Sequence, residues 1–363
     1  MTETIPEPCC ETLFRAGEKG YRRYRIPALT ATPRGAILAF CEARRHTGHD
    51  EDEIDILLRR SFDGGLTWDP PRTAVSDGSR TCGNPCPVVD GRTGAVLLLF
   101  CKDNREVFLT RSGDDGETWS APVAVPGVKD ASWSYVGTGP GHGIQLASGR
   151  LLIPAWADES PGPPTWRNPP ATWGKVQSSV VFLSDDRGET WRRSETMTRD
   201  ASDECEVVEV SDGVVYATMR CRQGRKCRAF SWSRDGGESW SEVAYDPGLP
   251  EPSCQGSIVR YDAERILLAH PGRTDERACL TVRVSRDGCR NWPAARVLAP
   301  GPAAYSDLAV SADGRILCFY EADEYRGLVM ARVDMGWVEG PPDRSLKSGR
   351  PESVGRKVKA DHG

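Results

Sequence analysis

The sequence predicts an all-β fold, a six-bladed β-propeller, on three observations. A related octapeptide recurs at intervals of about fifty residues, a period typical of repeat architectures. Short runs rich in Val, Ile, Leu and Phe accompany each octapeptide, which is the composition of β-strands. No long segment shows the 3.6-residue apolar period of a helix. A propeller removes exposed sheet edges by radial closure. A multi-domain array of β-sandwiches is the alternative, and the register shared by all six units disfavours it.

The octapeptides set the phase of the repeat, since each carries a Ser, an Asp two residues later and a closing Trp. They are SFDGGLTW (61–68), SGDDGETW (112–119), SDDRGETW (184–191), SRDGGESW (233–240) and SRDGCRNW (285–292). A strand is predicted directly before each one: IDILLRR (54–60), EVFLTR (106–111), SVVFL (179–183), RAFSW (228–232) and CLTVRV (279–284). The run GLVMARVDMGW (327–337) ends in a degenerate version of the octapeptide, which makes six units.

A second predicted strand lies further upstream in every unit and usually opens with glycine. These runs are GAILAFCEAR (35–44), GAVLLLFCK (94–102), GRLLIPAWAD (149–158), GVVYATMRC (213–221), RILLAHPGR (265–273) and GRILCFYEAD (314–323). Because side chains alternate faces along a strand, residues at equal offsets from the glycine project to equivalent sides. Seven residues on stand Glu42, Trp156, Arg220 and Glu321, and nine residues on stand Arg44 and Asp158. Polar and aromatic side chains therefore recur at one end of the strands, where a propeller gathers its functional groups.

The aspartates of the octapeptides are predicted to shape turns. An aspartate in a tight turn accepts hydrogen bonds from backbone N–H groups ahead of it, and glycine supplies positive φ. The closing tryptophan packs beside a neighbouring strand. A calcium loop requires further oxygen ligands and a glutamate at its twelfth position, which none of the five octapeptides supplies. The turn-forming residues are Asp63, Asp114, Asp186, Asp235 and Asp287.

Composition excludes several classes of function. The net charge of −5 gives no indication of a nucleic-acid partner or an anionic membrane surface. The longest apolar run, AVLLLFC (95–101), is too short to span a bilayer, and no secretory signal is visible, so a cytoplasmic location is predicted. The 13 cysteines are expected to be reduced, and none has zinc-ligand spacing with a matching second half, so no metal or cofactor is expected. Residues 1–340 are predicted to form the propeller, and the polar, basic residues 341–363 a disordered tail.

Several short motifs carry a resemblance to a known family. YRIP (24–27) together with the octapeptides, which match Asp boxes, is similar to the exo-α-sialidases, or neuraminidases. The sequence most closely resembles the animal cytosolic sialidases and their bacterial relatives. This closer resemblance lies in NPCP (84–87), GPGH (139–142), CQGS (254–257), AYSDL (304–308) and YEAD (320–323). The resemblance runs collinearly from about residue 24 to residue 321. It implies hydrolysis of terminal α-linked sialic acids from glycoconjugates with retention, through a tyrosyl intermediate.

The resemblance also implies roles for individual residues. Arg25, Arg220 and Arg277 match three arginines that bind the substrate carboxylate, a task suited to the planar, charged guanidinium. Glu321 matches the glutamate that braces the first arginine. Tyr305 matches the nucleophile, which starts neutral and is therefore not repelled by the anionic substrate. Glu204 matches its base, with Glu206 and Glu209 as nearby rivals.

The acid/base residue is expected on the loop RRHTGHDEDEID (44–55). Asp50 matches it and Asp52 is the second choice, since this loop is one residue longer than in the animal proteins. Neighbouring carboxylates are expected to disfavour ionisation of Asp50, which would help an acid keep its proton. An acidic, solvated loop without a catalytic member is the alternative reading.

Peripheral residues are implied in substrate binding. Residues that line the site in the family are matched by Arg44, Asn84 and Gln255. His142 is expected to be a turn or core histidine whose hydrogen bonds are satisfied within the fold. The animal proteins carry a Tyr-x-Tyr pair where Trp156 and Asp158 stand here, near the expected glycerol tail of sialic acid. Preference for another nonulosonic acid such as the deaminated form, transfer in place of hydrolysis, and a non-catalytic glycan-binding propeller therefore stay open.

Overall fold

The computed structural model describes residues 7–160, 176–197 and 202–340, and nearly all regular structure in these ranges is β-strand. The predicted all-β class is confirmed. The two helical elements are one turn each, η1 (Asp323–Tyr325) and α1 (Met335–Val338). No helix in the described ranges is both long and apolar enough to cross a membrane. The predicted tail at 341–363 lies outside the described residues.

Four sheets each form from one continuous stretch of chain, with neighbouring strands antiparallel. The first contains β2 (Arg23–Ala31), β3 (Ile37–Arg44), β4 (Ile54–Ser61) and β5 (Arg72–Val75). The second contains β6 (Cys82–Val89), β7 (Val96–Lys102), β8 (Glu106–Ser112) and β9 (Val123–Ala124). The third contains β10 (Tyr135–Thr138), β11 (Ile144–Gln145), β12 (Leu151–Asp158), β13 (Gln177–Ser184) and β14 (Arg192–Arg193). The fourth contains β15 (Ser202–Ser211), β16 (Val214–Cys221), β17 (Cys227–Ser233) and β18 (Ala244–Pro250).

The last sheet has seven strands because the long strand β22 takes part in two sets of pairings. Its order is β1-β24-β23-β22-β21-β20-β19. The strands are β1 (Cys9–Arg15), β19 (Ser257–Arg260), β20 (Ile266–Pro271), β21 (Ala278–Ser285), β22 (Ala294–Val310), β23 (Ile316–Ala322) and β24 (Gly327–Val333). The first part of β22 pairs with β21, and the part from Ala303 onward pairs with β23.

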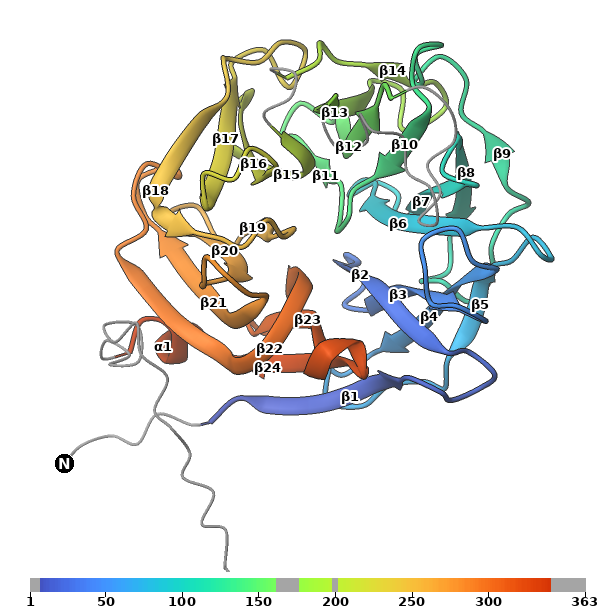
Figure 1. Cartoon of the computed structure of the whole chain (residues 1–363), viewed down its shortest axis with the longest axis horizontal. Coiled ribbons are helices and arrows are strands. Elements are labelled where there is room, and N and C mark those ends of the chain that lie inside the picture. Colours follow the sequence, from blue (N-terminus) through green and yellow to red (C-terminus); the bar gives the residue numbers. More distant parts are fainter. Residues whose placement is uncertain (1–6, 161–175, 198–201, 341–363) are drawn as a thin grey trace, which may run out of the picture.

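The sheets are arranged in a ring (Figure 1). Apolar side chains fill the space between neighbouring sheets. Phe40 of β3 and Phe100 of β7 belong to one such cluster, between the first and second sheets. Phe14, Leu29 and Phe319 belong to another, which joins the seven-stranded sheet to the first sheet and so closes the ring. All three are buried. Burial of apolar area between sheets is the main favourable contribution to holding such an arrangement together.

The turn role predicted for the octapeptide aspartates is confirmed. Asp63 accepts hydrogen bonds from the backbone N–H groups of Leu66 and Thr67 at 3.0 and 2.9 Å, and from the Thr67 hydroxyl at 2.6 Å. The hydroxyl bond, with the backbone bonds, lowers the pKa of Asp63 to about 2. Equivalent bonds form around the other four aspartates, Asp114, Asp186, Asp235 and Asp287. In the sixth unit a different device ends the strand, since Asp334 accepts from the N–H of Trp337 and caps α1.

Candidate active site

A tyrosine, a glutamate and an arginine from three strands meet near the centre of the ring. The Tyr305 hydroxyl, on β22, donates a hydrogen bond to Glu204 Oε1, on β15. Arg220 Nη1, on the paired strand β16, donates to both the Tyr305 oxygen and Glu204 Oε2, at 2.8 Å each. Burial raises the pKa of the Tyr305 phenol well above its usual value; Arg220 opposes this rise and Glu204 adds to it. The phenol is therefore neutral near pH 7, with a proton acceptor already in contact.

Two further arginines flank the ring of Tyr305. The guanidinium carbons of Arg25 and Arg277 lie 5.2 and 5.3 Å from the ring centroid. Together with Arg220 they place three cations around one phenol, although they come from β2, from β16 and from the residue before β21. The structure thus brings together all three arginines predicted for carboxylate binding. Three guanidinium groups repel one another, so their neighbours must offset part of the charge.

Glu321 offsets the charge of Arg25. Its Oε1 lies 2.5 Å from Arg25 Nε and its Oε2 lies 3.3 Å from Nη2, the forked geometry that arginine and carboxylate favour. The same carboxylate accepts from the backbone N–H groups of Ile26 and Tyr305 at 3.0 and 3.2 Å. Glu321 is 1% exposed, so one buried carboxylate connects an arginine, its strand and the strand of Tyr305.

A bulge in β2 directs Arg25 towards the centre. The pairing of β2 with β3 shifts register between Arg25 and Ala28, and Ile26 has a φ of 56°. A positive φ is rare for a β-branched residue and costs free energy, so it persists only where the surroundings hold it. Here the Ile26 N–H is held by Glu321. Bulges re-aim the side chains beside them, and this one accounts for the position of Arg25 next to Tyr305.

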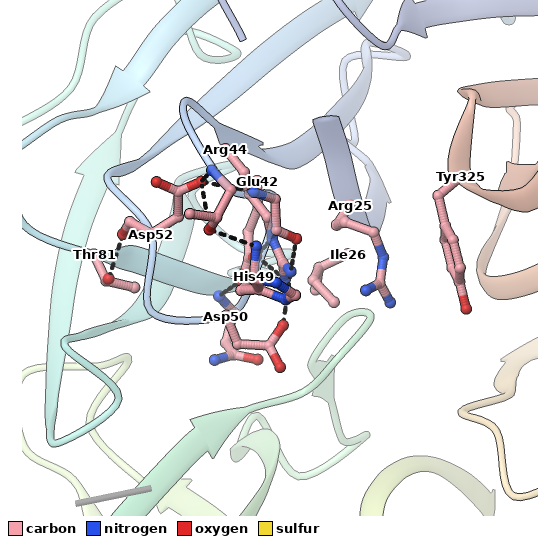
Figure 2. A network of polar contacts seen from close by, with 12 residues as sticks. Arg25, Ile26, Glu42, Arg44, His49, Asp50, Asp52, Thr81 and Tyr325 are labelled. Carbon is pink, nitrogen blue, oxygen red and sulfur yellow. Dashed lines mark hydrogen bonds and ion pairs between the residues drawn. The ribbon is translucent and has the colours of Figure 1, made fainter. Parts of the chain in front are cut away.

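The loop carrying Asp50 is joined to the first sheet through Arg44 (Figure 2). Arg44 Nη1 lies 2.7 Å from Asp50 Oδ1, while Arg44 Nε and Nη2 donate to Glu42 Oε2 at 2.8 and 2.5 Å. The side chain of Asp50 is 42% exposed and that of Arg44 only 2%. The sequence led us to expect only carboxylates around Asp50, and the structure adds a guanidinium in direct contact.

Asp52, the second choice for the acid/base residue, organises the loop. Its Oδ2 accepts from three successive backbone N–H groups, those of His46, Thr47 and Gly48, at 2.9, 2.7 and 2.8 Å. These bonds outweigh the effect of burial and lower the pKa of Asp52. Figure 2 shows Asp52 on the side of the loop away from Arg25.

Asn84 is connected to this loop through Asn104, and Tyr135 joins Asn84 to Trp156. The Asn84 N–H donates to Glu42 Oε1 at 2.7 Å, and its side-chain amide donates to the Tyr135 hydroxyl at 3.4 Å. The ring of Trp156 stacks on Tyr135 with centroids 4.4 Å apart. Glu42 therefore fixes both Arg44 and Asn84, and Trp156 is 7% exposed.

Asp158 and Gln255 lie deeper than the sequence suggested. Asp158 is fully buried and accepts from the backbone N–H of Ser160 at 2.7 Å. Gln255 is 1% exposed and exchanges two hydrogen bonds with the backbone of Ser306, at 3.0 Å each. Gln255 thus supports the strand residue next to Tyr305, and Asp158 supports the end of β12.

Glu206 and Glu209, the rivals of Glu204, face other partners. Glu209 accepts from the backbone N–H groups of Ala147 and Gly213. Glu206 is fully buried and accepts from Ile258 N at 2.7 Å. Burial and the carboxylate of Asp307 raise its pKa well above the usual range. His142 Nδ1 lies 2.7 Å from Asp307 Oδ1, so the expectation of a satisfied histidine is confirmed.

Comparison with known proteins identifies the family. The model of the BNR repeat-like domain matches residues 35–318. An exo-α-sialidase of Aspergillus fumigatus is 30% identical over 89% of this chain and 87% of its own length. The chain belongs to the sialidase family. Sialidase-3 of Mus musculus is also 30% identical, over 89% of this chain and 93% of that protein. The solved structure of Hadza microbial sialidase Hz136 superposes with a TM-score of 0.80 at 27% identity, covering 91% of this chain and 69% of that one.

Family membership confirms the resemblance that the motifs indicated, and sialidases are glycoside hydrolases. The sequence placed Glu42 at the strand end that gathers polar side chains, at the same offset from its glycine as Arg220 and Glu321, but gave it no individual role. One side chain at this site, Tyr325, was not indicated at all. Tyr325 follows YEAD in a turn, where no periodic pattern marks it.

Proposed function

We propose that this chain is an exo-α-sialidase that releases terminal α-linked sialic acids from oligosaccharides, glycoproteins or glycolipids with retention of configuration. One observation carries the mechanism. The neutral phenol of Tyr305 donates to Glu204 while three arginines surround it. Such a site suits a substrate whose anomeric carbon bears a carboxylate, because arginine pairs with carboxylate and a neutral nucleophile is not repelled by it.

In the proposed first step, the Tyr305 oxygen forms a bond to the anomeric carbon as the glycosidic bond breaks. The phenol proton passes to Glu204, and Asp50 gives a proton to the departing oxygen. In the second step water attacks the anomeric carbon and loses a proton to Asp50, while the Tyr305 oxygen leaves and recovers its proton from Glu204. Two displacements at one carbon give net retention.

The remaining site residues receive supporting roles. We assign the substrate carboxylate to Arg25, Arg220 and Arg277, with Glu321 holding the first of them in place. Arg44, in contact with Asp50, is assigned to the ring substituents. In this proposal Asn84 and Trp156 line the substrate site beside Arg44 and Asp50.

The decisive experiment replaces the nucleophile. Tyr305→Phe removes the oxygen and keeps the ring between Arg25 and Arg277, so hydrolysis of an aryl α-sialoside should fall by at least 1,000-fold, on the order expected for a catalytic nucleophile. Binding of an unsaturated sialic acid analogue that carries a carboxylate should persist. A Tyr305→Phe enzyme with near wild-type turnover would exclude the tyrosyl mechanism.

The position of Trp156 favours a second candidate substrate for the same reaction. A large ring stacked on Tyr135 stands where the animal proteins place a Tyr-x-Tyr pair, which would alter the space for the glycerol or N-acyl group. The enzyme would then prefer another nonulosonic acid, such as the deaminated form. Rates on aryl glycosides of N-acetylneuraminic acid and its deaminated analogue decide between the two substrates.

We also propose that the ring is a six-bladed propeller whose turns are Asp boxes. Dividing β22 near Pro302 turns the seven-stranded sheet into two sets of four strands: β19–β22, and the second part of β22 with β23, β24 and β1. With the other four sheets this makes six blades. The hydrogen bonds around the five octapeptide aspartates support the Asp-box assignment.

A further inference from the structure

The turn after β23 adopts a conformation that is costly for its residues. Asp323, Glu324 and Tyr325 have φ values of 50°, 54° and 68°, and none of them is glycine. Left-handed residues are uncommon outside glycine, asparagine and aspartate, so the cost falls mainly on Glu324 and Tyr325. Strain of this kind persists where the surrounding structure requires it, often at functional sites. The turn positions the side chain of its last residue, Tyr325.

Tyr325 lies against two of the three central arginines. Its ring centroid is 4.4 Å from the guanidinium carbon of Arg25, and its hydroxyl oxygen accepts from Arg277 Nη1 at 3.2 Å. Figure 2 shows the ring beside Arg25, extending from the segment that follows β23. Among the described residues, the other hydrogen-bond partner of Arg277 is the carbonyl oxygen of Ser253, at 3.1 Å.

The partners of Arg277 differ in charge from those of the other two arginines. Arg25 pairs with Glu321 and Arg220 pairs with Glu204, whereas no carboxylate in the described ranges lies within ion-pair distance of Arg277. A carboxylate at this position would cancel the positive charge that has to attract an anionic ligand. Water would leave the charge but allow the guanidinium to rotate. A phenol offers an acceptor oxygen and an electron-rich face while adding no charge.

We propose that Tyr325 is a positioning residue for carboxylate binding, holding Arg25 through its ring and Arg277 through its hydroxyl without neutralising either. This inference rests on the proposed sialidase function and adds to it a residue that the motifs did not indicate. The left-handed turn is the means by which the side chain reaches the arginines. Removing the hydroxyl should release Arg277 alone, and removing the ring should release both arginines.

The test compares a ligand that carries the carboxylate with its uncharged methyl ester. Inhibition constants are measured for an unsaturated sialic acid analogue and for its methyl ester, using the full-length wild-type protein, Tyr325→Phe and Tyr325→Leu. For the acid we expect the inhibition constant to rise about 5-fold in Tyr325→Phe, because one hydrogen bond is lost. We expect it to rise about 50-fold in Tyr325→Leu, because the cation–π contact is lost as well. For the ester both variants should stay within about twofold of wild type. Tyr261→Leu is the control, since it removes another ring that stacks on an arginine, Arg265, at 4.6 Å.

Two results would overturn the inference. A Tyr325→Leu protein that binds the acid as wild type does would show that the arginines need no such support. Equal weakening for acid and ester would assign Tyr325 to packing against the apolar cluster that contains Ala304 and Cys254. Wild-type protein that neither binds the acid nor cleaves an aryl sialoside would instead refute the proposed function, and that outcome is visible before any variant is made.

Discussion

Replacing Glu321 by glutamine should destabilise the protein strongly although the side chain keeps its shape. The two carboxylate oxygens face four donors: Arg25 Nε and Nη2, and the N–H groups of Ile26 and Tyr305. Glutamine has one acceptor oxygen, and its amide nitrogen must face donors in either orientation. The change also leaves the guanidinium of Arg25 without its carboxylate, in a site where the side chain of Arg25 is only 13% exposed.

The expected cost is about 3–5 kcal/mol of unfolding free energy. A charge-assisted hydrogen bond contributes about 1.5–3 kcal/mol and an unpaired buried N–H costs about 1–3 kcal/mol, and breaking a buried ion pair gives a similar total. Urea denaturation at pH 7, followed by tryptophan fluorescence, measures the change. Glu189→Gln is the matched control, because it breaks an exposed ion pair with Arg111 and should cost less than about 1 kcal/mol. Equal stability of the two variants would refute the reasoning.

Other consequences can be measured on the same protein. Hydrogen bonds hold the pKa of Asp63 and of Asp114 at about 2, below the unfolded value of about 3.9. These two groups therefore stabilise the folded state above pH 4, and this contribution is lost as the pH falls towards 2. Melting temperatures measured across an acid titration will record the loss. Burial raises the pKa of Glu206, so the folded state binds that proton more tightly than the unfolded state does. The stability of the protein should therefore decline as the pH rises above about 4. Glu206→Gln should flatten this decline in thermal melts recorded from about pH 4 to 9. Asp52→Asn should lower kcat about 10-fold by loosening the loop of Asp50, with inhibitor binding nearly unchanged in steady-state assays.

The all-β class and most strand positions could be predicted because they depend on local patterns. Hydrophobic runs and turn residues repeat in phase, so β3, β4, β7 and β8 lie where the sequence indicates. Side-chain parity also carried information, since Glu42, Arg220 and Glu321 share one offset and all three contribute polar contacts at the centre.

The depth and partners of individual side chains were less accessible. Gln255 bonds to the backbone of Ser306, 51 residues further along the chain, and that contact is set by the packing of distant segments. Asp158 accepts from the N–H of Ser160, just beyond the end of β12, and its burial depends on the surrounding fold. The contact of Arg44 with Asp50 depends on how Asp52 folds the loop. Tyr325 depends on three unusual backbone angles, which no composition rule indicates.

The pairing of β1 with β24 has a consequence for how the chain is made. Residue 9 pairs with residue 332 and residue 15 with residue 327, so β1 and β24, the outermost of the described strands in the sequence, lie side by side (Figure 1). During synthesis β1 emerges from the ribosome long before its partner exists, carrying the adjacent thiols of Cys9 and Cys10, both of which remain exposed in the finished fold. Until the chain is translated past Val333, this segment has unpaired edge groups that a chaperone or another nascent chain can engage. β1, which precedes every other described strand in the sequence, is thus among the last to be paired.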